Sequence, residues 1–301
     1  MKNRGKKMNW GLFVLAAPGM LLLLAFQYAP LFGLVIPFKR LDYSKGIWGS
    51  DWVGFKNFEF FFKSQSAFRV TRNTMLYNFA FIVIGTVVAV ALALMLFELS
   101  RNKVKIYQTC LFVPYFISWI VVSYVVYALL NPLYGLIPKA LQNGGAEAPM
   151  FYSAVKYWPF ILVVSNVWKG MGYTTLLYYA TLMGIDANMF EAAAIDGANK
   201  IQIVFRISIP FLVPIITILT ILSIGKIFNS DFGLFYFLPR NAGVLFPVTD
   251  TIDTYVYRAL RVTGEIGMAS AVGFYQSIVG FVLVLVSNLI VRRINPESSI
   301  F

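Results

Sequence analysis

A short polar stretch between two long apolar segments holds the residues whose types and spacing indicate a specific interaction. Glu191 supplies a carboxylate for a cationic or backbone partner, and Ala192 and Ala193 have side chains small enough for another backbone to approach closely. Gly197 can adopt a positive φ, which ends a helix and turns the chain. These residue types suit contact with another macromolecule better than a catalytic step.

The residues around this stretch predict two short helices outside the apolar segments. Asp186 is placed to accept backbone N–H groups at the start of a helix over 188–196, which is rich in alanine. Asn199 is a candidate cap for a second short helix that runs through Arg206, and Pro210 lies where the next apolar segment begins. The pattern therefore predicts a rigid helix–turn–helix.

The order of residue types from 191 to 210 matches the pattern E-A-A-x3-G-x9-I-x-L-P, with Ile209 in place of leucine. This pattern resembles the EAA loop in the membrane-spanning subunits of ATP-driven importers, so the chain resembles an ABC-importer permease. The resemblance implies that the loop fits a groove on a separate ATPase and transmits its closure to the membrane helices. The residues with this implied coupling role are Glu191, Ala192, Ala193, Asp196, Gly197, Ala198, Ile207 and Pro210. The alternative is an ordinary amphipathic loop at the membrane surface.

The chain lacks the side chains that many catalytic and metal sites need. It has no histidine and a single cysteine, Cys110, so histidine acid–base chemistry, an internal disulfide and a cysteine-rich metal site are excluded. It also has no G-x-x-x-x-G-K-[ST] phosphate-binding loop. We therefore expect neither enzyme activity nor a cofactor in this chain, and the resemblance implies that ATP and Mg²⁺ bind to the partner ATPase.

Composition places most of the chain in a membrane. Hydrophobic residues make up 59% and charged residues 13% of the 301 positions, which is more apolar surface than a soluble domain of this size could hide. Apolar runs long enough to cross a bilayer cover 11–38, 73–97, 106–138, 157–185, 207–225 and 266–291. In the third run we predict one helix near 109–130, ended by Asn131, Pro132 and Gly135.

The predicted fold class is an all-α membrane protein with six transmembrane helices. The resemblance specifies a type I ABC importer transmembrane domain, with the EAA helix–turn–helix, about 186–210, on the cytoplasmic side between the fourth and fifth helices. We expect residues 1–301 to form one permease domain. A secondary transporter would typically show inverted repeats and intramembrane acids, and a membrane-bound enzyme would need convergent catalytic groups; neither pattern is found in the sequence.

The net charge of +12 follows the ends of the predicted helices, as the positive-inside bias requires, and does not indicate nucleic-acid binding. Basic segments at 2–7, 101–105 and 292–293 fall on one side of a topology with six spans, which predicts a multi-pass protein of the cell (inner) membrane with both termini in the cytoplasm. The first run exceeds the ~7–15 apolar residues of a signal peptide, so we predict a retained helix. The basic segment 39–72 falls outside in this topology, against the bias.

Other segments resemble the sugar permeases among these importers. Residues 51–62 and 72–74 resemble the segment that leads into their second helix, and residues 114–131 resemble their third helix. Residues 252–258 and 271–280 resemble the LplB-type branch, which handles oligosaccharides and polysaccharide fragments. The resemblance therefore implies import of an oligosaccharide, and an importer for another solute, such as a peptide or a polyamine, is the nearest alternative.

The resemblance also implies a set of partners. This chain would form one half of a passage, and a second homologous permease subunit would form the other half. Two ATPase subunits would drive the passage, and an extracellular solute-binding lipoprotein would deliver the oligosaccharide. The charged outer segment 229–265 is either a docking surface for that lipoprotein or an ordinary solvated loop.

Polar and aromatic residues inside the apolar runs are candidates for the substrate path. Lys169 lies near the middle of the fourth run, where it either lines a water-filled path or snorkels to the surface, while Lys226 ends the fifth run and is expected at the interface. Aromatic faces and amide groups suit sugar rings and hydroxyls. The candidates are Tyr115, Ser118, Trp119, Asn166, Lys169, Phe228, Asn229, Tyr275 and Gln276. Helix packing or an interfacial belt is the alternative for each.

Two further expectations concern packing and cargo. Ala269, Gly273, Ser277 and Gly280 lie on the sixth run at a spacing that lets helices pack closely in lipid. Because the runs carry almost no fixed charge, we expect a neutral or weakly charged oligosaccharide as the cargo.

Overall fold

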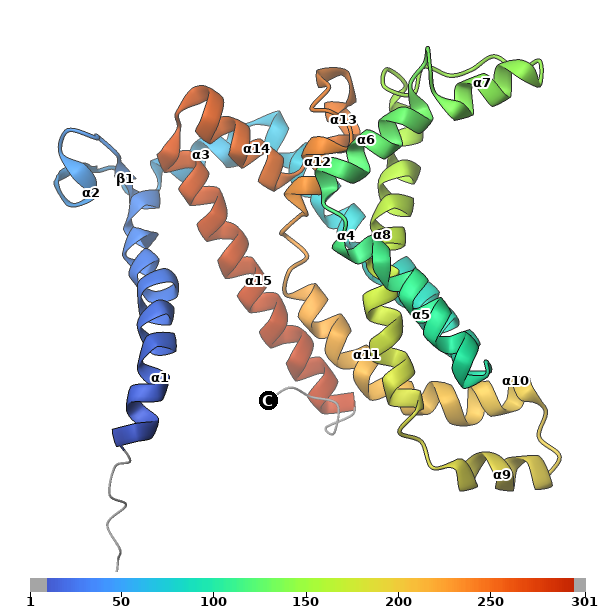
Figure 1. Ribbon diagram of the computed structural model, residues 1–301. Helices are drawn as coiled ribbons and strands as arrows, with labels where there is room; N and C mark the ends of the chain where they lie inside the picture. Colours follow the sequence, from blue (N-terminus) through green and yellow to red (C-terminus); the bar gives the residue numbers. More distant parts are fainter. Residues whose placement is uncertain (1–9, 295–301) are drawn as a thin grey trace, which may run out of the picture. The chain divides into compact units, whose positions relative to one another are not determined.

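The computed structural model describes residues 10–294, apart from the side chains at positions 60, 101 and 294, and nearly all of its regular structure is helical (Figure 1). The basic segment 2–7 lies outside the described residues. The chain forms two compact units, one of residues up to Lys63 with Ala259–Phe274, and the other of Ser64–Arg258 with the residues from Tyr275 on. Each unit is described by itself.

The first unit begins with a long apolar helix and continues into a small hairpin. The helix comprises α1 (Trp10–Leu23), a π-helical turn (Leu24–Tyr28) and a 3₁₀ segment (Ala29–Phe38), and its most apolar window buries no residue. The elements that follow are β1 (Lys39–Arg40), α2 (Gly46–Gly49), β2 (Asp51–Trp52) and α3 (Lys56–Lys63). A π-helical turn (Ala259–Thr263) and the first turns of α15 (Ile266–Ile294) complete the unit.

Two side chains hold the hairpin of the first unit in shape. The strands are antiparallel, with Lys39 opposite Trp52. Asn57 Nδ2 donates to the carbonyl oxygens of Pro37 and Lys39 at 2.8 and 2.9 Å. The Lys39 side chain is buried, and its ammonium donates to the carbonyls of α2 at Ile47 and Trp48. One charge of the predicted basic outer segment is thus used inside the hairpin.

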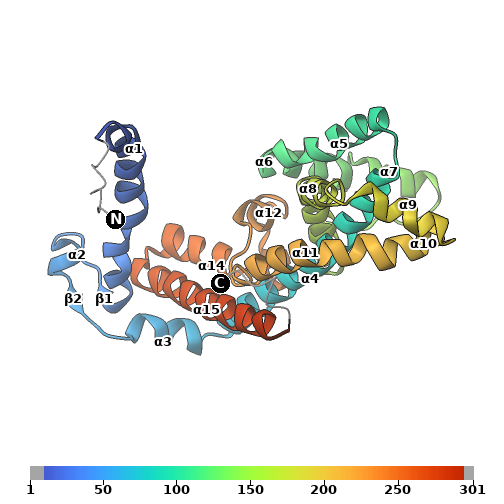
Figure 2. The same cartoon turned by 90° about the horizontal axis from the view of Figure 1, so that it is seen from below.

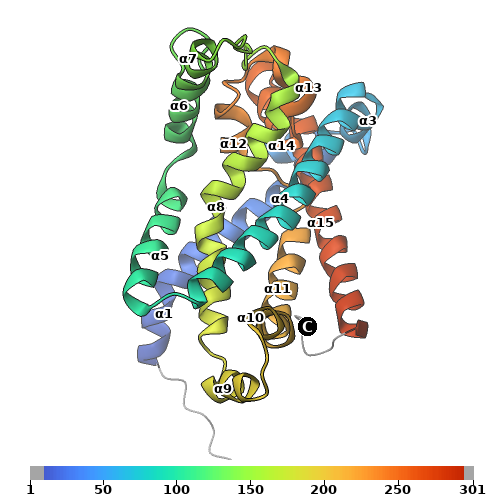
Figure 3. The ribbon, with the colours of Figure 1, turned by 90° about the vertical axis from the view of Figure 1, so that its right-hand side faces the viewer.

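The second unit contains the remaining helices, and α4, α8 and α11 lie side by side in it (Figures 2 and 3). Two small residues of α4, Ala89 and Ala93, form one buried cluster with Tyr178 and Leu182 of α8 and Leu212 of α11. The helices of this unit are α4 (Gln65–Phe97), α5 (Arg101–Phe116), α6 (Trp119–Leu130), α7 (Leu136–Asn143), α8 (Trp158–Leu182), α9 (Ala187–Ile195), α10 (Lys200–Ile203), α11 (Ile209–Ile224), α12 (Phe232–Phe237), α13 (Phe246–Thr249), α14 (Ile252–Arg258) and the rest of α15.

Within the described residues, four helices are long and apolar enough to cross a membrane: Trp10–Phe38, Gln65–Phe97, Lys200–Ile224 and Ile266–Arg293. The bent pair α5–α6 makes five if it is one span. The helix α8 has 25 residues but is not among these four. The all-helical class is confirmed apart from the two short strands, and the predicted number of six spans stays a prediction.

The prediction of a single helix near 109–130 is wrong, because the chain breaks at Ile117 and Ser118 and bends by 99° between α5 and α6. Pro114 in the last turn of α5 has no N–H for the helical ladder. Ser118 is extended, and its hydroxyl accepts from Val121 N, so it caps a new helix. As predicted, this helix ends before Asn131, whose side chain accepts from Leu133 N and Tyr134 N.

Close packing between α11 and α15 depends on glycine, as predicted for Gly280. A Cβ added at Gly280 would lie 2.6 Å from the carbonyl oxygen of Gly225. A Cβ added at Gly225 would lie 2.3 Å from a methyl group of Val284. The two backbones therefore approach so closely that a larger residue at either position would force them apart.

Candidate functional site

The helix α9 begins and ends as the sequence predicts. The Asp186 carboxylate accepts from Asn188 N at 3.0 Å and caps the first turn. At the other end Gly197 has a φ of 76°. The N–H of Ala198 donates to Ala193 O and that of Gly197 to Ala194 O, which pairs carbonyls that a helix end otherwise leaves free.

The second helix of the coupling loop (residues 186–210) starts as predicted but continues past its predicted end at Arg206. Asn199 and Gln202 cap each other's backbone N–H groups at 2.8–2.9 Å. The helix then passes through a π-helical turn, Val204–Ser208, into α11, so Lys200–Ile224 is one helix and the prediction of a separate short helix ending at Arg206 is wrong. Pro210 cannot donate an N–H, and the helix accommodates this defect by widening one turn.

The coupling loop is anchored on one side and exposed on the other. Phe190 packs against Phe97 at the end of α4, with ring centroids 5.4 Å apart, and Lys200 donates to the Glu98 carboxylate at 2.6 Å. Outward-facing apolar side chains on the loop are Ile195, Ile201 and Phe205, which are 85%, 70% and 66% exposed.

The predicted coupling residues lie mostly on this open surface. Glu191, Ala192, Asp196, Gly197 and Pro210 are exposed, whereas Ala193, Ala198 and Ile207 are half-buried. Glu191 has no ion pair with any described residue. The loop therefore presents a free carboxylate beside uncovered apolar side chains, as a docking element would.

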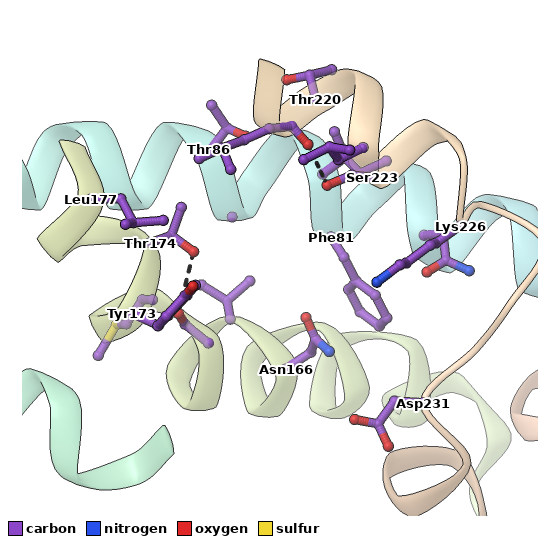
Figure 4. A pocket seen from close by; sticks show the side chains of 18 of the residues that line it. Phe81, Thr86, Asn166, Tyr173, Thr174, Leu177, Thr220, Ser223, Lys226 and Asp231 are labelled. Carbon is purple, nitrogen blue, oxygen red and sulfur yellow. Dashed lines mark hydrogen bonds between the residues drawn. The ribbon is translucent and has the colours of Figure 1, made fainter. Parts of the chain in front are cut away.

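A pocket of about 560 Å³, here called the central pocket, lies among α4, α8 and α11 (Figure 4). Its volume falls in the range of roughly 300–1,000 Å³ typical of sites for small ligands. Its wall is rich in amides and hydroxyls: Asn78, Thr86, Asn166, Tyr173, Thr174, Thr220, Ser223, Asn229 and Ser230, with the charged groups of Lys226 and Asp231. Such a wall offers many hydrogen bonds and few charges.

A second pocket of about 470 Å³, here called the side pocket, lies at the break between α5 and α6. It shares Asn166, Gly170 and Asp231 with the central pocket. The other residues of its wall are Tyr115, Ile117, Ser118, Trp119 and Lys169. The sequence proposed five of these eight residues for the substrate path, and the break in the helix is what brings them together.

Lys169 makes a specific bond in the side pocket. Its ammonium donates to the carbonyl oxygen of Tyr115 at 2.8 Å and lies 5.6 and 5.5 Å from the ring centroids of Tyr115 and Trp119. In an unbroken helix, that carbonyl would accept from the N–H of residue 119. Lys169 therefore lines a pocket, which agrees with the predicted alternative of a lining residue. Its ammonium also replaces the backbone donor that the Tyr115 carbonyl loses at the break.

Asp231 joins the two pockets and orients Trp119. One carboxylate oxygen accepts from the backbone N–H groups of Gly233 and Leu234 at the start of α12, and the other accepts from the Trp119 indole at 2.5 Å. A Cβ at Gly233 would lie 2.4 Å from the Trp119 ring. The sequence placed Asp231 in an outer loop and gave no signal that it would reach the pockets.

Lys226, which the sequence predicts at the interface, is exposed and extends into the central pocket (Figure 4). Its ammonium has no hydrogen bond, ion pair or ring contact with any described residue. The turn that carries it is fixed, because Asn78 Nδ2 donates to the carbonyl oxygens of Ile227 and Asn229 at 3.0 Å each. The polar residue Asn78, inside the second apolar run, is the feature of the sequence from which this part of the pocket wall could have been predicted.

Three predicted path residues do not line either pocket. Phe228 is buried and meets Tyr275 edge to face at 5.9 Å, and Gln276 is buried and donates to Phe228 O at 2.6 Å. They connect the end of α11 to α15. Asn229, by contrast, does line the central pocket.

Much of the charge in segment 229–265 is used within the fold. Asp250 is 2% exposed and pairs with Arg258, and with Arg69 of α4 at 3.6 Å. Asp253 accepts from the N–H and hydroxyl of Ser230. Arg240 stacks over Tyr127 at 4.2 Å. These contacts hold the segment against the rest of the fold. The exposed charged residues of the segment are Asp231, Arg240, Arg261 and Glu265.

The chain is similar in sequence and in structure to known transport proteins. Residues 82–296 match the family described as binding-protein-dependent transport system inner membrane component. Protein LplB of Bacillus subtilis is 33% identical over 97% of this chain and 91% of its own length, and the polygalacturonan/rhamnogalacturonan transport system permease protein YteP of the same organism is 30% identical over 95% and 89%. A crystal structure of a bacterial alginate ABC transporter, in complex with an alginate pentasaccharide-bound periplasmic protein, contains a similar chain: TM-score 0.86, 29% identity, and 95% coverage of each chain.

Proposed function

Because this chain belongs to the family of binding-protein-dependent transport system inner membrane components, we propose that it forms half of an ATP-driven passage for an oligosaccharide. It is a multi-pass membrane permease subunit, and it is similar along nearly its whole length to permeases of polysaccharide-fragment transporters. The cargo would arrive on an extracellular solute-binding lipoprotein, as alginate does on a periplasmic protein in the similar structure.

The observation that carries the proposal is the wall of the central pocket. Amides and hydroxyls from α4, α8 and α11 face one cavity, with Asn166 at its middle (Figure 4). Tyr115 and Tyr173 stack at 5.1 Å beside it and offer aromatic faces. Hydroxyl-rich rings with apolar C–H faces need this combination of hydrogen-bonding groups and flat apolar surface. The matching wall would come from a second, homologous permease subunit.

The driving force would enter through the coupling loop. Its exposed surface, with Glu191 and the side chains of Ile195, Ile201 and Phe205, would fit a groove on one of two ATPase subunits. Those subunits would bind ATP and Mg²⁺, and this chain would bind neither. Because Lys200–Ile224 is one helix, a displacement of the loop would pass directly along α11 to the pocket wall at Thr220, Ser223 and Lys226.

The arrangement of the second unit supports a topology with both termini in the cytoplasm. Its coupling loop and the C-terminal end of α15 lie at the same end, and α6, α7 and α13 lie at the opposite end (Figures 1 and 3). An ATPase in the cytoplasm would therefore place the C-terminus in the cytoplasm of the cell (inner) membrane. The basic residues at 2–7 favour the same side for the N-terminus. We propose that both units together form one permease domain.

Stimulation of ATP hydrolysis tests the proposal. The chain is co-purified with its permease, ATPase and binding-protein partners, reconstituted in nanodiscs, and assayed with oligosaccharides, peptides or polyamines. We expect the ATPase to co-purify and an oligosaccharide to stimulate hydrolysis in the presence of the binding protein. Stimulation by peptides or polyamines but by no glycan would show an importer for another solute. Absence of any co-purifying ATPase would contradict the importer itself.

A further inference from the structure

Three charged groups face the two pockets, and two of them are already bonded. Lys169 donates to the Tyr115 carbonyl and lies over two rings, so its charge holds the break between α5 and α6. Asp231 accepts three hydrogen bonds from Gly233, Leu234 and Trp119. Both side chains hold the fold in place before any cargo arrives.

Lys226 is the third charged group, and its situation is different. Its ammonium has no partner among the described residues, although it lines the central pocket. Its backbone is held by bonds from Lys226 N to Ser223 O and from Asn229 N to Lys226 O, and by the two bonds from Asn78. The fixed backbone thus holds an exposed ammonium, with no protein partner among the described residues, at the wall of the cavity.

We propose that Lys226 binds the carboxylate of a uronic-acid unit as the oligosaccharide crosses the passage, so that the cargo is an acidic glycan. This inference rests on the proposed function and names the chemical class of its substrate. An ammonium is a compact, strongly hydrated charge on a flexible stem, which suits an anion that binds briefly and leaves, unlike the bidentate grip of arginine.

The neighbours of Lys226 fit the rest of such a sugar unit. Asn166 points into the same cavity, and its amide has no partner among the described residues (Figure 4). Thr220 and Ser223 add hydroxyls from the preceding turns of α11. The sequence led us to expect a neutral or weakly charged cargo because the apolar runs lack fixed charge. We revise this expectation because Lys226 lines the pocket and has no protein partner among the described residues.

The test compares import of two glycans that differ only in charge. The complete transporter is reconstituted in proteoliposomes with its binding protein, and uptake is measured for labelled oligogalacturonate and for the same oligomer with its carboxyl groups reduced to alcohols. The variant is Lys226→Gln, and Lys226→Arg restores the charge. Lys156→Gln is the matched control, because Lys156 is an exposed lysine of the same unit whose ammonium lies over Tyr157, away from both pockets.

We expect Lys226→Gln to lower uptake of the acidic glycan about tenfold or more, as loss of a hydrogen-bonded charge partner would. Uptake of the reduced glycan by this variant should match that of Lys156→Gln, and Lys226→Arg should recover most of the acidic uptake. Equal acidic uptake by Lys226→Gln and Lys156→Gln would overturn the inference, and so would equal loss of both glycans. If the wild-type transporter imports neither glycan but imports a peptide or a polyamine, the proposed function itself fails and the inference fails with it.

Discussion

The ammonium of Lys169 lies 2.8 Å from the carbonyl oxygen of Tyr115, 54 residues earlier in the chain, and donates a hydrogen bond to it. This bond joins α8 to the last turn of α5, where the helical ladder stops and the chain bends by 99°. Lys169 is therefore both a lining residue of the side pocket and the donor that stabilises the bend.

Replacing Lys169 tests its role at the bend. Lys169→Met keeps the length of the side chain but leaves the Tyr115 carbonyl without its donor, so we expect a loss of about 1 kcal/mol of unfolding free energy and slower transport. Lys169→Arg can still donate and should retain most of both. Thermal unfolding in detergent and uptake in proteoliposomes measure the two effects. Identical behaviour of the Met variant and the wild type would show that the bond does not matter.

Water should reach position 169 from the passage. In a Cys110→Ser background, which removes the single cysteine, a Lys169→Cys variant should react with a membrane-impermeant thiol reagent. The labelling rate should also change when ATP is added, because closure of the ATPases alters the passage. If the thiol stays unlabelled in every state, position 169 is sealed and the side pocket is not part of the path.

The coupling loop should fail in a specific way when its turn or its charge is changed. Gly197→Val places a β-branched residue at a φ of 76°, which costs roughly 1–2 kcal/mol, and Glu191→Lys reverses an exposed charge. Both variants should reach the membrane and show little or no sugar uptake. Uptake and ATPase co-purification are measured on the same preparations. Normal uptake by both variants would remove the coupling role.

The close contact between α11 and α15 should be sensitive to a single methyl group. Gly280→Ala places a Cβ 2.6 Å from Gly225 O, so we expect a loss of about 1–3 kcal/mol of stability. Gly85→Ala, in α4, is the control because no atom lies within 4 Å of the added Cβ. Thermal unfolding compares them. Equal unfolding temperatures would mean that the helices separate without cost.

Local signals in the sequence predicted the coupling loop well. Asp186, Gly197 and Asn199 act within a few residues of themselves, so a cap or a turn could be placed from residue type and spacing. The end of the second helix could not be placed in this way. Pro210 is compatible with either a new helix start or a widened turn, and only the continuous packing of Lys200–Ile224 decides between them.

The pockets were predictable only in part, because their walls come from segments far apart in the chain. Tyr115, Trp119, Asn166 and Lys169 were recognisable as polar or aromatic residues within apolar runs. Asp231 lies outside those runs, and the bend between α5 and α6 that brings Tyr115 to Lys169 is hidden in one unbroken apolar run over 106–138. Phe228 and Gln276 are an aromatic and an amide residue, as several lining residues are, but Gln276 donates to the Phe228 carbonyl oxygen outside both pockets, a difference that residue type does not encode.

The most direct test of the central claim is accumulation of a labelled oligosaccharide in proteoliposomes that contain the full complex. ATP is sealed in the lumen of the vesicles, and the loaded binding protein is added outside. Only complexes whose ATPases face the lumen are therefore active. The account predicts ATP-dependent accumulation of the glycan in the wild type and none with Gly197→Val. Accumulation that is the same without ATP, or that persists in the Gly197→Val complex, would contradict an ATP-driven permease coupled through this loop.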